Sequence, residues 1–224
     1  MQHDMLEDVK VLCHSSIKID MERTIYFDPY NVDKYYNDAD IIFITHDHYD
    51  HYSEEDIKKV RKSDTFIVIP EDMFTKVLKL GMNEKYIVRV QPNKEYSIGN
   101  IKFQTIPAYN ITKQFHPKEN GWVGYILQLD GIKYYIAGDT DMTQDNENVN
   151  CDVAFVPVGG TFTMDYREAA KLVNKIKPKI AVPIHYGLIV GTKQDAEHFV
   201  NSLDKGIEGR ILIKSWKGSR KCKT

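Results

Sequence analysis

The chain has few cysteines, no apolar run of membrane length and no excess of either charge, and each shortage excludes a class of protein. Its three cysteines, Cys13, Cys151 and Cys222, lie far apart and form no C-x-x-C pair. This spacing argues against a thiolate metal site or a redox pair. A small, odd number of scattered cysteines is typical of proteins of the reducing cytoplasm. No stretch approaches the ~18 uninterrupted apolar residues of a membrane span, and no secretion signal opens the chain. We therefore expect a cytoplasmic protein with no membrane partner.

The charges of the chain nearly balance. Thirty basic residues stand against 32 acidic ones, which gives a net charge of -2. Such a chain has no overall field to attract a polyanion, so nucleic acid is not the expected partner, and the short basic stretch 214–223 is interpreted as a solvated tail. The 224 residues, 42% of them hydrophobic, allow one sizeable core, and no linker or repeat divides them. We predict one domain over residues 1–224. The sequence does not determine the oligomeric state, and a homo-oligomer is one possibility.

Apolar patterns and turn signals predict a β-rich first part followed by alternating strands and helices. Four helices are expected: one capped by Ser53, one after Pro70, one over 165–176 that ends before Pro178, and one from the Thr192-x-x-Asp195 box. Sheets flanked by helices in both halves predict a layered α/β sandwich with its site at strand ends. The expected strands are 10–13, 16–19, 24–27, 41–44, 65–69, 86–90, 101–106, 121–129, 133–137, 153–158, 180–183 and 210–214.

A cluster of potential metal ligands follows the buried strand 41–44. His46, His48 and Asp50 alternate along the chain, so an extended segment would project them to one side, and His51 stands at the bend into the next helix. Imidazole and carboxylate ligands suit zinc and related dications. The alternative is an exposed loop that is merely rich in histidine, but random placement would produce this pattern at roughly one in a thousand. A purely structural zinc site usually has thiolate ligands, and no cysteine is near in sequence.

This cluster resembles the signature of the metallo-β-lactamase superfamily, whose members carry His-x-His-x-Asp-His after a buried strand. The segment Gly138-Asp139-Thr140 is similar to the superfamily's Gly-Asp motif, and Pro183-Ile184-His185 is similar to its last histidine motif. The order and spacing of these motifs agree over nearly the whole chain. The resemblance implies the metallo-β-lactamase fold, a four-layer αββα sandwich of two similar halves. It also implies two divalent metal ions in one cleft, with zinc as the first expectation and Mn²⁺ or Fe²⁺ as alternatives.

The resemblance implies a role for each matching residue. His46 and His48 would bind the first metal, Asp50, His51 and His185 would bind the second, and Asp139 would bridge the two. Where many members place another histidine of the first site, this chain has Pro107-Ala108-Tyr109-Asn110. We expect His116 to take that place by the folding back of its loop. The alternative is that His116 is an ordinary loop histidine, which leaves the first metal weakly bound or absent.

Four further residues are candidates for a place around the metals or the substrate. Asp28 either orients a ligand histidine through its ring N–H or only forms a turn before Pro29. His14 either borders the cleft or is a structural histidine. Tyr109 and Tyr186 stand next to the motifs and are candidates for handling a proton or a leaving group.

The resemblance is closest to a branch of small prokaryotic metal-dependent hydrolases that is similar to ascorbate-phosphate lactonases and to the phospholipase D acting on N-acyl phosphatidylethanolamine. It implies that a hydroxide held between the metals attacks an ester, lactone or phosphodiester, while Asp50 or a tyrosine manages the proton. Two dications outweigh the charges of Asp50 and Asp139, so a small anionic substrate is expected. Two alternatives remain: a non-catalytic metal-binding or regulatory member of the same fold, and a nuclease.

Overall fold

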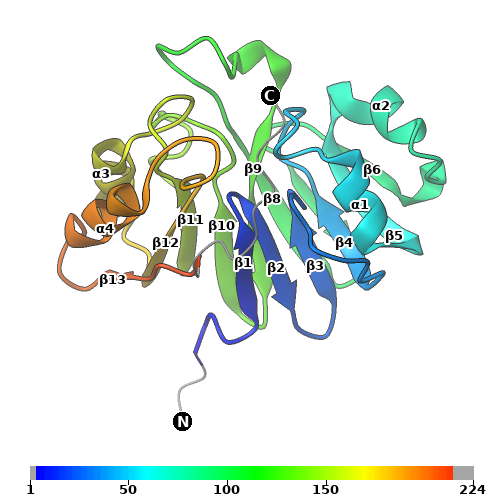
Figure 1. The fold of residues 1–224 in the computed structure, drawn as a ribbon, viewed down its shortest axis with the longest axis horizontal. Helices are drawn as coiled ribbons and strands as arrows, with labels where there is room; N and C mark the ends of the chain where they lie inside the picture. Colours follow the sequence, from blue (N-terminus) through cyan, green and yellow to red (C-terminus); the bar gives the residue numbers. More distant parts are fainter. Residues whose placement is uncertain (1–3, 214–224) are drawn as a thin grey trace.

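The structure is a computed structural model that describes residues 4–213; Cys222 and the basic stretch 214–223 lie outside these residues. Figure 1 shows two β-sheets between two pairs of helices, with α1 and α2 beside the first sheet and α3 and α4 beside the second. The four layers confirm the predicted αββα sandwich. Within the described part of the chain, no helix combines the length and the apolar character that crossing a bilayer requires.

The first sheet takes its strands in sequence order, β1 to β6. Strands β1 to β3 pair antiparallel, and β3 to β6 pair parallel. The elements are β1 (Val9–Cys13), β2 (Ser16–Asp20), β3 (Thr24–Phe27), β4 (Ala39–Phe43), α1 (Glu54–Val60), β5 (Arg61–Pro70), the 3-10 turn η1 (Glu71–Met73), α2 (Phe74–Leu78), the 3-10 turn η2 (Glu84–Tyr86) and β6 (Ile87–Val90).

The second sheet contains seven strands in the order β13-β12-β11-β10-β9-β8-β7. Strands β7 to β10 pair antiparallel, and β10 to β13 pair parallel. The elements are β7 (Glu95–Ile98), β8 (Ile101–Pro107), η3 (Lys118–Asn120), β9 (Val123–Leu129), β10 (Ile132–Ile136), β11 (Val153–Pro157), α3 (Tyr166–Ile176), β12 (Ile180–Ile184), α4 (Lys193–Asn201) and β13 (Glu208–Gly209).

One pattern of strand pairing occurs twice. Strands β1 to β6 form two antiparallel pairs and then three parallel ones, and β8 to β13 do the same. Strand β7 is an addition at the edge of the second sheet. The repeat agrees with the two similar halves that the family resemblance implies, and it places the turns after β3 and β4 in positions equivalent to those after β10 and β11.

Aromatic side chains from both sheets fill the core between them. The rings of Phe27 and Phe43 stack with centroids 4.9 Å apart, and Tyr125 of β9 packs edge-on against Phe43 at 5.0 Å. Tyr125 is fully buried, and its hydroxyl donates a hydrogen bond of 2.7 Å to the carbonyl of Ile44. The second sheet thereby holds the end of β4 at the point from which the histidine cluster departs.

Most predicted elements are present, and three differ. Ser53, Asp165 and Thr192 cap their helices, and Thr192 forms a full capping box with Asp195. Pro70 precedes the 3-10 turn η1 as its cap and is not the first helical residue. The closing strand expected at 210–214 occurs earlier, as β13, because the pairing with β12 ends at Gly209. Strand β7 was missing from the prediction, since only four residues alternate there.

Candidate metal centre

The histidine cluster leaves β4 as an extended segment and then turns sharply. The backbone N–H groups of His51 and Tyr52 both donate to the carbonyl of His48, at 3.0 and 2.7 Å. His46 and His51 are almost fully buried, His48 is half-buried and Asp50 is 7% exposed. The turn therefore sends His46 and His48 to one side and brings Asp50 to another side of the same buried space.

Three loops of the second sheet bring the other predicted ligands to this space. Asp139 follows β10, His185 follows β12, and His116 lies in the loop between β8 and β9. Asp139 Oδ2 lies 3.0 Å from His185 Nε2 and 3.3 Å from His116 Nε2. Asp139 Oδ1 lies 3.3 Å from His51 Nε2. Both carboxylate oxygens of Asp139 thus face imidazoles, and the loop with His116 folds back as expected.

The potential ligand atoms form three groups, within each of which all atoms lie within 4.8 Å of one another, and His46 belongs to two of these groups. Each group takes two residues from the first half of the chain and one from the second. The groups are His46, His48 and His116; His46, His51 and Asp139; and His14, Asp50 and His185. Every residue that the sequence nominates as a ligand belongs to one of them, and His14 joins the third.

The donor atoms in these groups fit a bound divalent cation. His14, His51 and His116 have buried ring nitrogens, and Asp139 a buried carboxylate oxygen, that have no hydrogen-bond partner within residues 4–213. A buried polar atom without a partner costs about 1–3 kcal/mol, and a cation among these atoms would remove that cost. Imidazole and carboxylate donors without a thiolate suit zinc and related dications.

Asp28 and Thr45 support the imidazoles of the first half from behind. Asp28 Oδ2 lies 2.7 Å from His51 Nδ1, so the ring N–H donates to the carboxylate and Nε2 faces Asp139. Asp28 also accepts from the backbone N–H and the hydroxyl of Thr45, at 2.8 and 2.7 Å. The Thr45 hydroxyl lies 2.9 Å from His46 Nδ1. Of the two predicted roles of Asp28, the structure therefore shows the contact that orients a histidine.

An amide performs the same task for His116. Asn110 Oδ1 accepts from the backbone N–H of His116 at 3.1 Å and lies 2.9 Å from its Nδ1, which leaves Nε2 pointing at Asp139. Asn110 in turn donates to Asp141 Oδ1 at 3.0 Å. The sequence reasoning assigned no role to either residue. The sequence held a usable signal for Asp141, which is a second acidic residue two positions after the predicted ligand Asp139.

Trp122 is another residue that the sequence reasoning missed. Its ring lies 5.0, 5.1 and 5.8 Å from the rings of His46, His48 and His116. Its indole N–H donates to Asp72 at 3.0 Å, which fixes the ring as one wall of the first histidine group. The signal in the sequence was weak. It was the position of Trp122, one of the two tryptophans of the chain, at the end of the loop that carries His116.

The two candidate tyrosines occupy different surroundings. The hydroxyl of Tyr109 donates to Asp145 at 2.8 Å and lies 3.2 Å from Lys118 Nζ, so it faces a surface pair and not the histidines. Tyr186 is 2% exposed, and its hydroxyl has no hydrogen-bond partner among the described residues. Burial raises the pKa of Tyr186 to about 12, so its phenol stays protonated at neutral pH.

The electrostatics of the centre favour positive charge. Burial opposes ionisation of Asp139, but the imidazoles of His185 and His51 outweigh burial and hold its pKa well below the usual range. Burial likewise disfavours charge on His185, yet the Asp139 carboxylate raises the pKa of that imidazole to about 9. Burial also opposes ionisation of Asp50, but the neighbouring imidazoles, with His51 foremost, outweigh burial and lower the pKa of that carboxyl. The ionised carboxylates of Asp50 and Asp139 in a nearly dry space therefore attract positive charge, which a metal ion would supply in place of protons.

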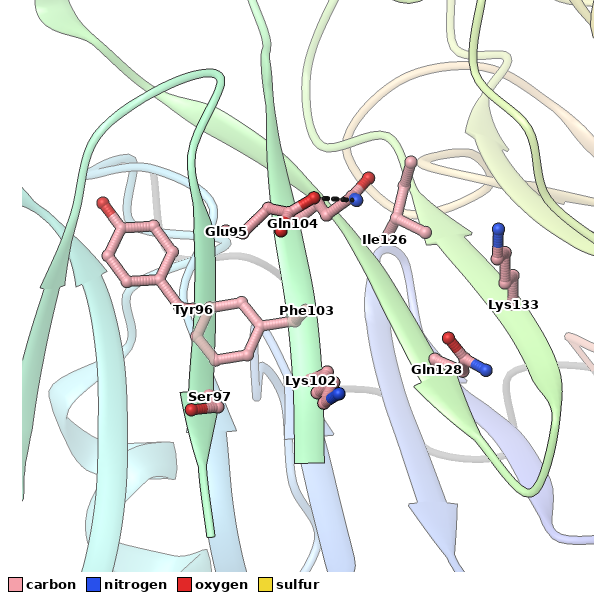
Figure 2. Close-up of a pocket in the computed structure, with 9 residues that line it drawn as sticks. All are labelled: Glu95, Tyr96, Ser97, Lys102, Phe103, Gln104, Ile126, Gln128 and Lys133. Carbon is pink, nitrogen blue, oxygen red and sulfur yellow. Dashed lines mark hydrogen bonds between the residues drawn. The ribbon is translucent and has the colours of Figure 1, made fainter. Parts of the chain in front are cut away.

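A hollow elsewhere on the surface is separate from this centre. Figure 2 shows residues that line it on strands β7 to β10, among them Lys102, Gln128 and Lys133. The hollow has a volume of about 540 Å³. Gln104 donates to Glu95 across it at 2.7 Å. None of its lining residues is a histidine or a cysteine, so it offers no group of imidazole ligands.

Comparison with known proteins agrees with the geometry. The model of the beta-lactamase superfamily domain matches residues 8–185. A UPF0173 metal-dependent hydrolase of Thermococcus kodakarensis is 33% identical in an alignment of 217 residues, which covers 91% of this chain and 95% of the relative. One of Lysinibacillus sphaericus is 31% identical over 89% of this chain and 93% of the relative. A crystal structure from Parabacteroides distasonis superposes with a TM-score of 0.75 at 33% identity and covers 91% of each chain. The chain thus belongs to the beta-lactamase superfamily and, within it, to the family of the UPF0173 metal-dependent hydrolases.

Proposed function

We propose that the chain is a hydrolase that binds two divalent cations, zinc foremost, and cleaves an ester, lactone or phosphodiester bond in a small anionic substrate. The observation that carries this proposal is the convergence of three ligand groups around the buried Asp139. The family names of the relatives support a metal-dependent hydrolase, and they leave the substrate open.

The proposal divides the predicted ligands between two cations. His46, His48 and His116 would hold the first, and Asp50, His51 and His185 would hold the second, with Asp139 between them. Cations bound there supply Lewis-acid chemistry: they polarise the bond to be broken and lower the pKa of water toward neutrality. The alternative role of His116 as an ordinary loop histidine is disfavoured, because Asn110 aims its Nε2 at Asp139.

The chain's own residues orient the reaction and handle the proton. Asp28 and Asn110 fix the rings of His51 and His116, so the centre needs little rearrangement when substrate arrives. Asp50 is the best-placed group for taking up and returning a proton, because its carboxylate is slightly exposed at the edge of the buried space. Tyr109 is less suited, since its hydroxyl is engaged with Asp145.

The surroundings of the centre suit a substrate with a charged end and an apolar body. Two cations would carry more charge than Asp50 and Asp139 neutralise, which favours an anionic group near them. Three apolar or aromatic side chains adjoin the site residues in sequence and are exposed: Tyr49 at 63%, Ile111 at 63% and Phe115 at 45%. Phe115 packs edge-on against Phe162 with ring centroids 4.6 Å apart. These side chains offer contact area for the uncharged part of a substrate.

The test is a measurement of bound metal together with a substrate panel. We expect about two equivalents of zinc per chain by mass spectrometry and turnover of at least one class among chromogenic esters, lactones and bis(4-nitrophenyl) phosphate. Dialysis against a chelator should abolish turnover, and added Zn²⁺ or Mn²⁺ should restore it. Bound metal without turnover on any class would favour the non-catalytic alternative, and salt-dependent cleavage of RNA or DNA would favour the nuclease.

A further inference from the structure

His14 is a buried histidine at the centre that the family motifs leave without a role. It follows β1 in the first hairpin and is 0% exposed. Neither of its ring nitrogens forms a well-aligned hydrogen bond within residues 4–213, although Nε2 lies 3.3 Å from Asp50 Oδ2. A histidine that only fills a core would have a partner for at least its N–H group, because an unpartnered buried donor is costly.

The position of its Nε2 matches that of a metal ligand. His14 Nε2 lies 3.3 Å from Asp50 Oδ2, and His185 Nε2 lies 3.6 Å from the same oxygen. Two atoms that each lie about 2.1 Å from one cation are separated by roughly 3 to 3.6 Å at coordination angles of about 90° to 120°. Each nitrogen thus lies from Asp50 Oδ2 at about the spacing of neighbours around one ion, and the ligand atoms of the three residues all lie within 4.8 Å of one another.

The backbone of His14 points to the same role. His14 and His185 both have left-handed backbone angles, with φ of 51° and 58°. The backbone N–H of His185 donates to the carbonyl of His14 at 3.0 Å, and the two rings lie 4.0 Å apart. The left-handed conformation costs a residue with a side chain about 1–2 kcal/mol. His14 and His185, which lie side by side in the structure, both adopt this unfavourable conformation. In it, the Nε2 atoms of both rings lie close to Asp50 Oδ2.

We infer that His14 Nε2 is a further ligand of the second cation, an inference that rests on the metal binding in the proposed function. Three imidazoles (His14, His51, His185) and the carboxylates of Asp50 and Asp139 then surround this ion. The first cation has three imidazoles and Asp139 alone. The second site is accordingly the tighter of the two, and a chelator removes the first cation before it.

The direct test is the zinc-loaded wild-type protein, in which crystallography locates each zinc by its anomalous signal. We expect His14 Nε2 at about 2.1 Å from one of the two zinc ions. A distance beyond about 3 Å, with His14 donating to Asp50 instead, overturns the inference and leaves the proposed function intact. A protein that binds no zinc overturns both.

A variant tests the same inference in solution. His14→Asn removes the imidazole, and asparagine tolerates a left-handed backbone; His198→Ala, on the exposed side of α4, is the control. We expect His14→Asn to lose at least about 100-fold in affinity for one zinc and to change the cobalt absorption of that site. An unchanged cobalt spectrum contradicts the inference. Circular dichroism and thermal unfolding establish that the variant folds; if it does not, the zinc-loaded wild-type structure decides.

Discussion

The two halves of the molecule share one pattern of strand pairing but supply their ligands in different ways. In the first half, His46 to His51 come from a single turn whose own backbone hydrogen bonds shape it. In the second half, His116, Asp139 and His185 come from three separate loops. The first arrangement is local and the second depends on the tertiary fold, so removing a residue that supports a ligand in one half, and then in the other, tests whether the two halves act independently.

Substitution of Asp139, which contacts imidazoles from both halves, should have the largest effect on metal binding and turnover. Asp139→Ala deletes the carboxylate that faces His51 of the first half and His116 and His185 of the second. We expect loss of both cations and a fall in turnover of at least about 1,000-fold. Zinc analysis and initial rates measure this, with the exposed Asp64→Ala as control. Full activity of Asp139→Ala would contradict the proposed function.

Asp28→Ala should have the next largest effect on metal binding, and it changes the support of a ligand from the first half of the chain. It leaves the Nδ1 of His51 and the hydroxyl of Thr45 without their buried partner. We expect about a 100-fold loss of affinity for the second cation, with the first retained. Equilibrium dialysis with zinc separates the two sites. Equal weakening of both cations would show that the two halves are not independent supports.

Asn110→Ala is the matching change in the second half. It frees the ring of His116, whose Nδ1 then has no acceptor to set its orientation. We expect a loss of about 10-fold in affinity for the first cation and little change at the second, because Asn110 is a neutral partner where Asp28 is a charged one. The same dialysis experiment applies. Loss of the second cation instead would reverse the assignment of His116.

Ser53→Ala should have the smallest effect and should leave the centre unchanged. Ser53 accepts from the backbone N–H of Asp56 and caps α1, which follows the histidine turn. We expect a loss of about 1 kcal/mol in the free energy of unfolding, measured by denaturant titration, with zinc content unaltered. Thr192→Ala, which removes the cap of α4 in the other half, should cost about the same. A change in bound zinc in either variant would link helix capping to the site.

The sequence predicts the local features of this protein best. The histidine turn, the Asp139 motif and the His185 motif are each contiguous, so their placement at strand ends follows from local patterns. The layered fold follows from strands and helices whose apolar periodicity is clear. The Asp-Gly pair at 130 and 131 is typical of a two-residue hairpin turn, and the structure has this turn between β9 and β10, with positive φ at both residues.

The features that escaped prediction depend on how loops fold. The contact of Asn110 with His116 spans six residues in sequence, but it needs the loop to turn back on itself, which no propensity specifies. Trp122 lies against the histidines with its indole N–H donating to Asp72, which is fifty residues away in the sequence. The burial of His14 requires both sheets to be in place, because its closest ring neighbour, His185, follows β12. Long-range packing, and not local sequence, creates these contacts.

Each ligand group takes two residues from the first half of the chain and one from the second, and this division has a consequence for folding. Among residues 4–213 neither half contains a complete group, so we expect these groups to capture a metal ion only once the sheets have docked. Once captured, the ion cross-links segments that are remote along the chain, much as a disulfide restricts the unfolded ensemble. Metal supply would then govern the lifetime of the folded protein as well as its chemistry, with chelation expected to hasten separation of the sheets.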